Sequence, residues 1–320
     1  MNPNDISFPH LGIYLKNLPN GFNIGTFRIA FYGITFAIGV LAGILVAAKN
    51  AKEYGQDENT YWDFVIREII FSLIGARIYY IIFAWDLFFK DDFVNGNIGK
   101  ALFNLINLRA GGIAIYGAVI AAFIVLFIFC KRKKLNPFIY GDAAVPGLIL
   151  GQAIGRWGNF FNREVFGEYT DSLFAMRLPV DGMYVRAMDI SQLQAQKMLE
   201  QGVNYIQAHP TFLYESVCNL LIFALLMFMR KRKKFNGEIC LLYFGCYGIV
   251  RFIIEGIRTD QLKIPGIGVP VSQVVAIALI LVAIVGEVAC RNMIRKNTLP
   301  AFFKYEKVEK TEPKSGEKTE

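Results

Sequence analysis

The chain has 320 residues, of which 54% are hydrophobic and 14% aromatic, and its length alone would permit one or two soluble domains. Its formal net charge is +8, but the basic residues abut apolar blocks, so nucleic acid is not expected as a partner. Two histidines are too few for a histidine metal cluster, and the five cysteines include no C-x-x-C pair. Neither a metal site, an organic cofactor nor a disulfide framework is therefore expected.

Seven apolar blocks of about 18 to 25 residues follow one another along the chain, and each is long enough to cross a hydrocarbon layer ~30 Å thick. The blocks cover residues 27–48, 64–89, 113–130, 141–160, 213–229, 238–258 and 266–289. The sequence therefore predicts an all-α polytopic membrane protein with seven transmembrane helices.

Clusters of lysine and arginine indicate the orientation of these helices. The densest are "KRKK" at 131–134 and "RKRKK" at 230–234, and smaller ones follow the first and last apolar blocks. All four fall on one side if the chain crosses the membrane seven times. The positive-inside rule then places the N-terminus outside and the C-terminus in the cytoplasm.

The composition between the blocks predicts three parts. Residues 1–26 form an extracytoplasmic N-terminal segment, 27–290 the transmembrane domain, and 291–320 a charged cytoplasmic tail that we expect to be disordered. The outside loop at 161–212 is long enough for a small extracytoplasmic cap, and its amphipathic portion at 188–201 predicts a helix.

Ionisable residues occur within or at the ends of the apolar blocks. Each would cost about 2.5–3.5 kcal/mol if exposed to lipid at a helix centre, so these residues must pair inside the bundle or line a polar cavity. They are Arg77, Arg156, Glu164, Arg251 and Glu255.

The segment "RFIIEGIR" places Arg251, Glu255 and Arg258 on one helical stripe, at i, i+4 and i+7. Glu255 can neutralise only one arginine, and a guanidinium left over beside a membrane surface favours a phosphate, which it binds bidentately. The alternative is a buried ion network that only orders the bundle.

A second arginine site lies in "GRWGNFFN", where Arg156 and Asn159 share a helix face. Gly155 and Gly158 allow a backbone or a ligand to come close, and Asn159 can donate to phosphate or glycerol oxygens. Alternatively, the small residues only allow this helix to pack closely against another helix, and the Arg156 side chain extends to the membrane–water interface.

Weaker patterns involve Tyr32 in "AFYGI", Tyr116 after a Gly-Gly turn, and His209 before a proline. Each also fits a plain structural role: an interfacial tyrosine, a turn and a loop residue. The chain has no H-E-x-x-H, G-x-S-x-G or P-loop motif, which excludes the corresponding metalloprotease, hydrolase and nucleotide-binding sites.

The stretch "GRWGNFFNREVFG" resembles the signature G-R-x-G-N-F-x-N-x-E-x-x-G of prolipoprotein diacylglyceryl transferases at every fixed position. "GARIYY", "GGIAIYG", "HPTFLYE" and "CYGIVRFIIEGIR" extend the resemblance over roughly 30–290. The resemblance implies a seven-helix protein of the bacterial inner membrane. Its expected activity transfers the sn-1,2-diacylglyceryl group of phosphatidylglycerol to the lipobox cysteine of a prolipoprotein, forming a thioether and releasing glycerol phosphate. Phosphatidylglycerol, prolipoprotein signal peptides and membrane lipids are the partners this implies.

Residue by residue, the resemblance implies that Arg156 binds the phospholipid and that Arg251 is a second essential arginine. Family positions with proposed functional roles also fall on Asn159, Glu164, Gly167, Tyr32 and Glu255. One position departs from the family: many members have a histidine, often nominated as the base, where this chain has Tyr116.

These observations suggest a mechanism in which Arg156 and Arg251 hold the phosphodiester and neutralise the departing phosphate. Asn159, Glu164 and Tyr32 position the head group, with Arg258 as a further anion ligand, and Tyr116 accepts or relays the thiol proton.

A competing interpretation is a lipid transporter or flippase that binds phosphate without chemistry. The absence of internal sequence repeats weighs against it, because many transporter folds consist of duplicated halves. A structural membrane scaffold would leave the polar cluster unexplained.

Overall fold

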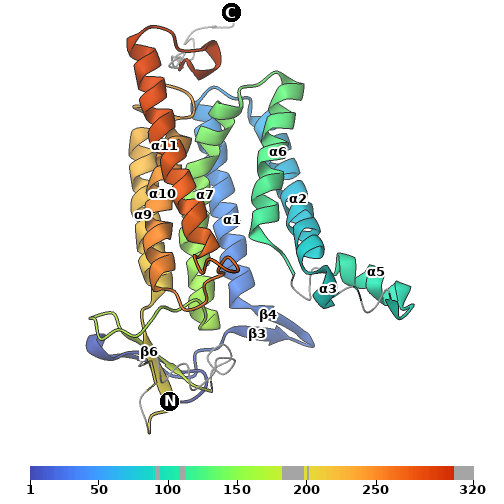
Figure 1. Ribbon diagram of the computed structural model, residues 1–320, viewed down its shortest axis with the longest axis vertical. Coiled ribbons are helices and arrows are strands. Elements are labelled where there is room, and N and C mark those ends of the chain that lie inside the picture. The colour runs from blue at the N-terminus through green and yellow to red at the C-terminus, as the bar shows by residue number, and fades with distance from the viewer. Residues whose placement is uncertain (89, 91–93, 108–111, 182–197, 200–201, 306–320) are drawn as a thin grey trace, which may run out of the picture. The chain divides into compact units, whose positions relative to one another are not determined.

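The computed structural model describes the whole chain except residues 89, 91–93, 108–111, 182–197, 200–201 and 306–320 (Figure 1). The chain divides into two compact units. The first comprises Met1–Ala47 and Asp142–Tyr305, and the second is built on Ala48–Gly141. Each unit is described by itself.

Helices dominate both units. In chain order the described helices are α1 (Phe31–Glu53), α2 (Glu58–Phe83), α3 (Trp85–Phe88), α5 (Ile98–Ile106), α6 (Ile115–Lys133), α7 (Pro137–Asn162), α9 (Thr211–Met229), α10 (Glu238–Ile257) and α11 (Val271–Arg295). The 3-10 turns are η1 (Pro9–Leu11) and η4 (Ala301–Phe303). The strands are β1 (Ile6–Phe8), β2 (Ile13–Leu15), β3 (Gly21–Ile24), β4 (Phe27–Ala30), β5 (Met176–Pro179) and β6 (Tyr205–Ala208).

Several helices begin where the sequence supplies a start signal. Pro137 is the first residue of α7, and prolines 210 and 270 directly precede α9 and α11. Proline suits these positions because the first helical N–H groups have no intrahelical partner. Asp57 caps α2, since its side chain accepts a hydrogen bond from the backbone N–H of Thr60 at 2.7 Å.

Six of the seven predicted spans coincide with described helices that are long and apolar enough to cross a membrane: α1, α6, α7, α9, α10 and α11. The seventh, 64–89, overlaps α2, which has 26 residues but does not belong to this set. The reason is charge, because Arg67, Glu68 and Arg77 all interrupt its apolar stretch.

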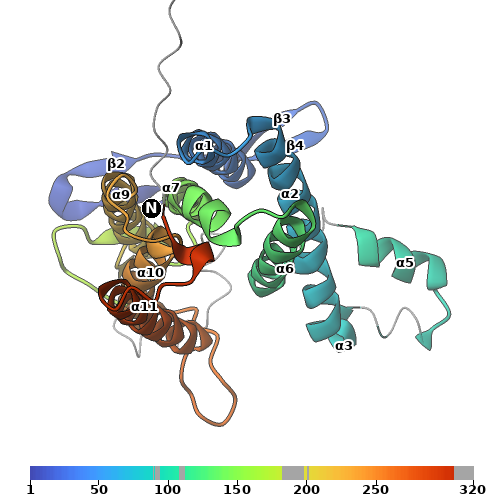
Figure 2. The same ribbon diagram turned by 90° about the horizontal axis from the view of Figure 1, so that it is seen from above.

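In the first unit, α10 lies between α9 and α11 (Figure 2), and α7 joins α9 and α10 around an apolar core that includes Ile149, Leu226 and Ile239. Helices α1 and α7 approach closely through paired glycines. A Cβ atom on Gly39 would lie 2.8 Å from the carbonyl oxygen of Gly151, so neither position leaves room for a side chain.

A four-stranded antiparallel sheet of order β2-β1-β5-β6 covers the end of the first unit where α9 begins (Figure 1). Ile6 pairs with Leu15, and Leu178 pairs with Ile206. A separate hairpin, β3–β4, leads directly into α1. The all-α prediction is therefore corrected to a mostly helical fold with two small sheets. The strands have only three or four residues, too few for an alternating pattern to be recognised in the sequence.

In the second unit, α2 and α6 pack against each other, with Gly75 and Gly117 at their contact. The buried Arg77 side chain donates to the carbonyl oxygens of Leu105 and Gly112, both at 2.8 Å, and of Asn104. Backbone carbonyl groups thus accept hydrogen bonds from the Arg77 guanidinium inside the protein, as expected for a charge within an apolar block.

Regular structure is described beyond residue 291. Helix α11 continues past residue 291 to Arg295, and Asn236 donates from its backbone N–H to Phe303 at 2.9 Å and from its side chain to Lys304 at 2.7 Å. Lys233, from the basic cluster at 230–234, is fully buried and pairs with Asp142 at 2.9 Å. The remaining tail from 306, and nearly all of the helix predicted at 188–201, lie outside the described residues.

Candidate active site

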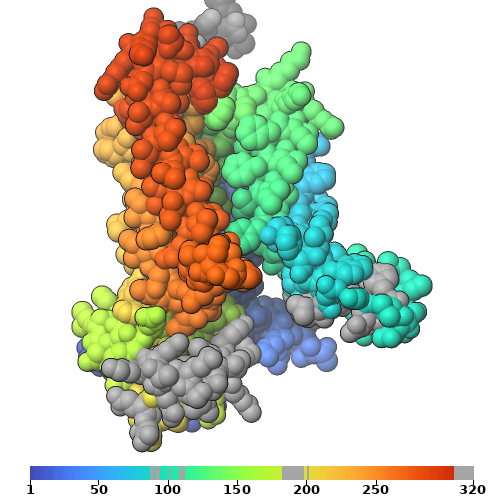
Figure 3. Space-filling model, viewed as in Figure 1, coloured from blue at the N-terminus to red at the C-terminus, as the bar shows by residue number. Residues whose placement is uncertain are grey.

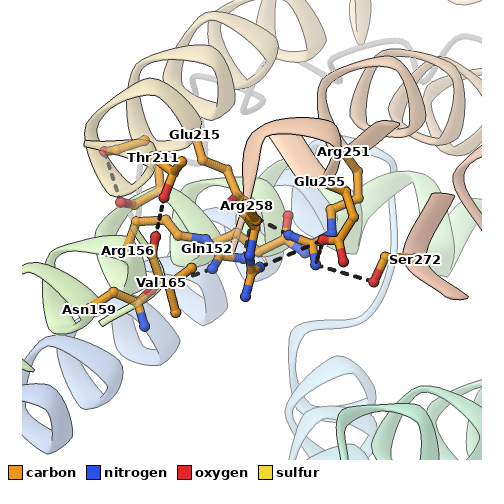
Figure 4. Close-up of polar contacts among 12 residues, drawn as sticks. Gln152, Arg156, Asn159, Val165, Thr211, Glu215, Arg251, Glu255, Arg258 and Ser272 are labelled. Atoms are coloured by element: carbon orange, nitrogen blue, oxygen red, sulfur yellow. Dashed lines mark hydrogen bonds and ion pairs between the residues drawn. The ribbon is translucent and has the colours of Figure 1, made fainter. Parts of the chain in front are cut away.

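Three arginines and two glutamates meet at one end of the helices of the first unit (Figure 4). Arg156 on α7 forms an ion pair with Glu215 on α9, with 2.7 Å between Nη2 and Oε1. Arg251 on α10 contacts Glu255 at 2.6 Å and the other oxygen of Glu215 at 3.8 Å. Arg258 is 3.8 Å from Glu255. Arg251 and Glu255 share a face of α10 as predicted, whereas α10 ends at Ile257 and Arg258 follows it in an extended conformation. Arg258 still lies near Glu255, and the cluster joins all three residues to Arg156.

Burial within this cluster differs by sign of charge. The side chains of Glu215 and Glu255 are 1% and 3% exposed, whereas those of Arg156 and Arg251 are 20% and 17% exposed. The carboxylates therefore lie beneath the guanidinium groups, and the accessible face of the cluster is cationic. Such a face suits a phosphate, because a guanidinium can donate two parallel hydrogen bonds to it.

Glu215 is a site residue that the sequence reasoning missed. It is the only acidic residue of α9, whose other residues are largely apolar, and it lies within the predicted span 213–229. That isolation is the signal that could have identified it, by the same argument that singled out Arg156. The sequence leaves one guanidinium of Arg251 and Arg258 without a charged partner after Glu255 is counted, and Glu215 partly neutralises this excess charge.

Asn159 and Glu164 continue the site along the end of α7. Arg156 donates to the Asn159 side chain at 3.4 Å, and Asn159 donates to Glu164 at 2.8 Å. Asn162 donates to the same glutamate oxygen at 3.3 Å. The predicted shared face of Arg156 and Asn159 is confirmed, and Glu164 is oriented by two amides.

The backbone around Glu164 is unusual. Both of its neighbours adopt the left-handed region, with φ of 57° at Arg163 and 59° at Val165. For a β-branched residue such as valine this conformation is strained. It is held by Thr211, whose hydroxyl donates to the carbonyl oxygen of Val165 (Figure 4).

Arg163 serves the fold rather than the cationic face. Its buried guanidinium donates to the carbonyl oxygens of Asn4 at 2.7 Å and of Leu18. These two carbonyls belong to the N-terminal segment, so Arg163 fixes that segment beside the end of α7. The strands β1 and β2 are consequently attached to the same loop that orients Glu164.

Gly167, predicted to contribute to substrate binding, makes backbone contacts. Its N–H donates to the carbonyl oxygen of His209 at 2.9 Å, and it forms an isolated bridge with Arg258. A Cβ at this position would lie 2.8 Å from the carbonyl oxygen of Ile257. Only glycine lets the loop after α7 come this close to the end of α10, where Arg258 begins the next loop.

Tyr32 and Tyr116 are placed differently. Tyr32, the second residue of α1, lies in the first unit against Gly158, where a Cβ would be 2.7 Å from the tyrosine ring. Tyr116, the second residue of α6, belongs to the second unit, and its ring is 6.4 Å from that of Tyr79. The described contacts therefore bring Tyr32, but not Tyr116, together with the signature segment.

Long apolar helices that enclose a cluster of paired arginines and buried glutamates are typical of a polytopic membrane protein. The sequence profile of the family described as prolipoprotein diacylglyceryl transferase matches residues 19–289. The chain belongs to this prolipoprotein diacylglyceryl transferase family.

Two similar proteins are both named phosphatidylglycerol–prolipoprotein diacylglyceryl transferase. The protein of Finegoldia magna is 39% identical over 277 residues, which cover 86% of this chain and 97% of the relative. The protein of Staphylococcus aureus strain MRSA252 is 38% identical over 266 residues, which cover 83% of this chain and 86% of the relative.

Proposed function

We propose that this protein is a phosphatidylglycerol–prolipoprotein diacylglyceryl transferase, which transfers the diacylglyceryl group of the lipid to prolipoproteins. The family membership and the names of the relatives support this activity. The observation that carries it on the structural side is the cationic face formed by Arg156 and Arg251 above the buried Glu215.

The finer chemistry is a displacement at the carbon of the diacylglyceryl group that bears the phosphate. The lipobox cysteine sulfur forms a thioether bond to this carbon, and the bond from the carbon to the phosphate oxygen breaks. The two electrons of the broken bond leave with glycerol phosphate, and the thiol proton is transferred to a base. The sn-1,2-diacylglyceryl group thereby passes from phosphatidylglycerol to the signal peptide.

Arg156 and Arg251 stabilise the leaving group in this scheme. Negative charge accumulates on the phosphate as the bond breaks, and charge-assisted hydrogen bonds of roughly 1.5–3 kcal/mol each favour that state in a dry site. Asn159, Glu164 and Tyr32 position the head group, with Glu255 and Arg258 completing the substrate site. Gly167 sets the backbone spacing on which these side chains depend.

Thiol activation is the second requirement. An unperturbed cysteine has a pKa near 8.5, so only a few per cent is thiolate at neutral pH. We propose that Tyr116, at the position of the family histidine, accepts or relays the proton. No metal or organic cofactor is required by this scheme.

We further propose that the protein crosses the bacterial cytoplasmic membrane seven times, with its N-terminus outside. Helix α2 serves as the seventh span, which the carbonyl partners of Arg77 make possible. Basic residues end α6 at 131–133 and follow α9, consistent with a cytoplasmic location of these ends. Residues 27–290 then form the transferase domain, and 161–212 lie in an extracytoplasmic cap.

The test is transfer itself, with purified protein, phosphatidylglycerol and a synthetic lipobox peptide, followed by mass spectrometry of the peptide. We expect a diacylglyceryl mass gain on the cysteine, and we expect Arg156→Ala to abolish it. Arg28→Lys, at an exposed position of β4, preserves all charges and is a control for handling in detergent. Near-wild-type activity of the Arg156 variant would disprove the phosphate-binding role. No mass gain with wild-type protein that still binds the lipid would favour a lipid transporter.

A further inference from the structure

Arg258 at the end of α10 has an additional anionic partner outside the buried cluster. Its Nε donates to Oδ1 of Asp260 at 2.9 Å, and its Nη2 donates to Oδ2 at 2.8 Å. The contact to Glu255, at 3.8 Å, is longer. Asp260 therefore occupies two donors of the guanidinium fork in a bidentate arrangement.

Asp260 differs from the other acids of the site in its exposure. Its side chain is 47% exposed, whereas that of Arg258 is 11% exposed. It lies at the start of the loop between α10 and α11, which is at the surface of the first unit (orange in Figure 3). An ion pair with one partner this exposed contributes little to stability, so separating it costs little.

A phosphate fits the donors that Asp260 now occupies. The planar fork of a guanidinium binds carboxylate and phosphate oxygens in the same bidentate way. Arg258 also shares Glu255 with Arg251, but it does so through Nη1, so Nε and Nη2 remain the donors for a second anion. The carboxylate of Asp260 thus stands in for an anionic ligand at the edge of the site.

We propose that Asp260 is an internal competitor for Arg258. It releases Arg258 to the phosphate of the bound lipid and reoccupies it when glycerol phosphate leaves. This inference rests on the proposed function, and it assigns to Asp260 a role in product release.

The charges of substrate and product explain why such a competitor is useful. The phosphodiester of the lipid carries one negative charge, whereas a phosphate monoester carries about −1.5 to −2 near neutral pH. Three arginines would therefore hold the product more tightly than the substrate. A carboxylate two residues from Arg258 competes at a high effective concentration, because it is part of the same chain.

The experiment measures inhibition of peptide modification by added glycerol phosphate. Asp260→Asn removes the charge at constant size, and we expect its inhibition constant to fall about two- to five-fold, which is the effect of deleting a weak ion pair. Asp260→Glu keeps the charge, and its inhibition constant for glycerol phosphate should equal that of the wild type. An unchanged constant in the Asn variant would overturn the proposal, and so would an equal decrease in both variants.

Two further arms separate this role from others. In an Arg258→Gln background the Asp260→Asn change should have no effect on the inhibition constant, whereas a persisting effect would show that Asp260 acts elsewhere. Calorimetric binding of glycerol phosphate to the purified protein needs no peptide. If the wild type transfers nothing but the Asp260→Asn variant binds glycerol phosphate more tightly than the wild type, the competitor is supported and the proposed function is contradicted. Equal binding with normal transfer would contradict the competitor alone.

Discussion

The carboxylate of Glu215 on α9 and the guanidinium of Arg156 on α7 lie 2.7 Å apart, with the acid buried and the base partly exposed. Because the second oxygen of Glu215 is 3.8 Å from Arg251, one buried acid is shared by the two arginines to which we assign phosphate binding. The spacing of the two guanidinium groups therefore depends on a residue that need not touch the substrate.

Replacing Glu215 by Gln should lower kcat/KM for transfer by at least ten-fold, because Arg156 loses the carboxylate that fixes its position and Arg251 is then held by Glu255 alone. Loss of one member of a buried ion pair also destabilises a protein by about 3–5 kcal/mol. Glu215→Asp keeps the charge on a shorter side chain and should lose less of both. The measurements are steady-state transfer and the thermal unfolding midpoint in detergent. Unaltered transfer by a well-folded Gln variant would rule out the positioning role.

Tyr116→Phe tests the proposed proton relay. Phenylalanine keeps the ring beside Tyr79 but removes the hydroxyl, so folding should be preserved and turnover should fall by about 10²–10⁴-fold if the hydroxyl transfers the proton. Tyr79→Phe, which changes the neighbouring ring in the same way, is the matched control. Equal turnover of wild type and Tyr116→Phe would remove this tyrosine from the chemistry.

Asp5 makes the stability of the N-terminal sheet pH-dependent. Hydrogen bonds from the Tyr14 hydroxyl and from the backbone N–H groups of Asn17 and Asn2 lower the pKa of Asp5 to about 2. The folded-state pKa lies below the unfolded value near 3.9, so the stabilisation is complete above that value and is lost as pH falls toward 2. Asp5→Asn should lower the unfolding midpoint at pH 7, and its difference from wild type should shrink between pH 4 and pH 2.

Tyr14→Phe checks the cause of that dependence. It deletes the 2.6 Å hydrogen bond, the largest contribution to the lowered pKa, and leaves the two backbone bonds in place. The loss of stability on acidification should still begin near the unfolded pKa, but it should end at a higher pH than in the wild type and be smaller in total. A midpoint that follows the wild-type curve at every pH would show that this bond does not set the pKa.

The glycine pairs between α1 and α7 can be tested with a matched substitution on one helix. Gly147→Ala places a methyl group against the backbone carbonyl of Gly43, and overpacking of this kind costs about 1–3 kcal/mol. Gly155→Ala meets no atom within 4 Å and should instead be neutral or slightly stabilising through its higher helix propensity. Thermal unfolding of the two variants gives the comparison, and similar midpoints would contradict the close crossing.

Local periodicity explains which parts of the site could be predicted. Arg251 and Glu255 lie one turn apart on α10, and Arg156 and Asn159 lie on one face of α7, so helical spacing alone predicts each pair. Arg258 directly follows α10, so its closeness in sequence predicts that it lies near Glu255. Glu215 comes from another helix, and nothing in the spacing of either arginine segment indicates where α9 packs. Its proximity to both arginines is seen only in the packing of α7, α9 and α10.

Helical spacing could not predict the four-stranded sheet either. Its strands have only three or four residues, and two of them lie in the N-terminal segment. The contacts that hold them, from Arg163 to two backbone carbonyls, involve acceptors that every residue possesses. A side chain that binds backbone groups far away in the sequence leaves no pattern from which the partner can be identified.

The left-handed valine at position 165 has a consequence for directed evolution of heat tolerance. Glycine there would relieve a backbone conformation that costs about 1–3 kcal/mol in a β-branched residue, so a screen for thermal stability alone should select Val165→Gly. The same change would free the loop that aims Glu164 at Asn159. Variants of this enzyme selected only for thermal stability should therefore have a higher unfolding midpoint and a lower turnover. Position 165 is where we expect this trade-off first.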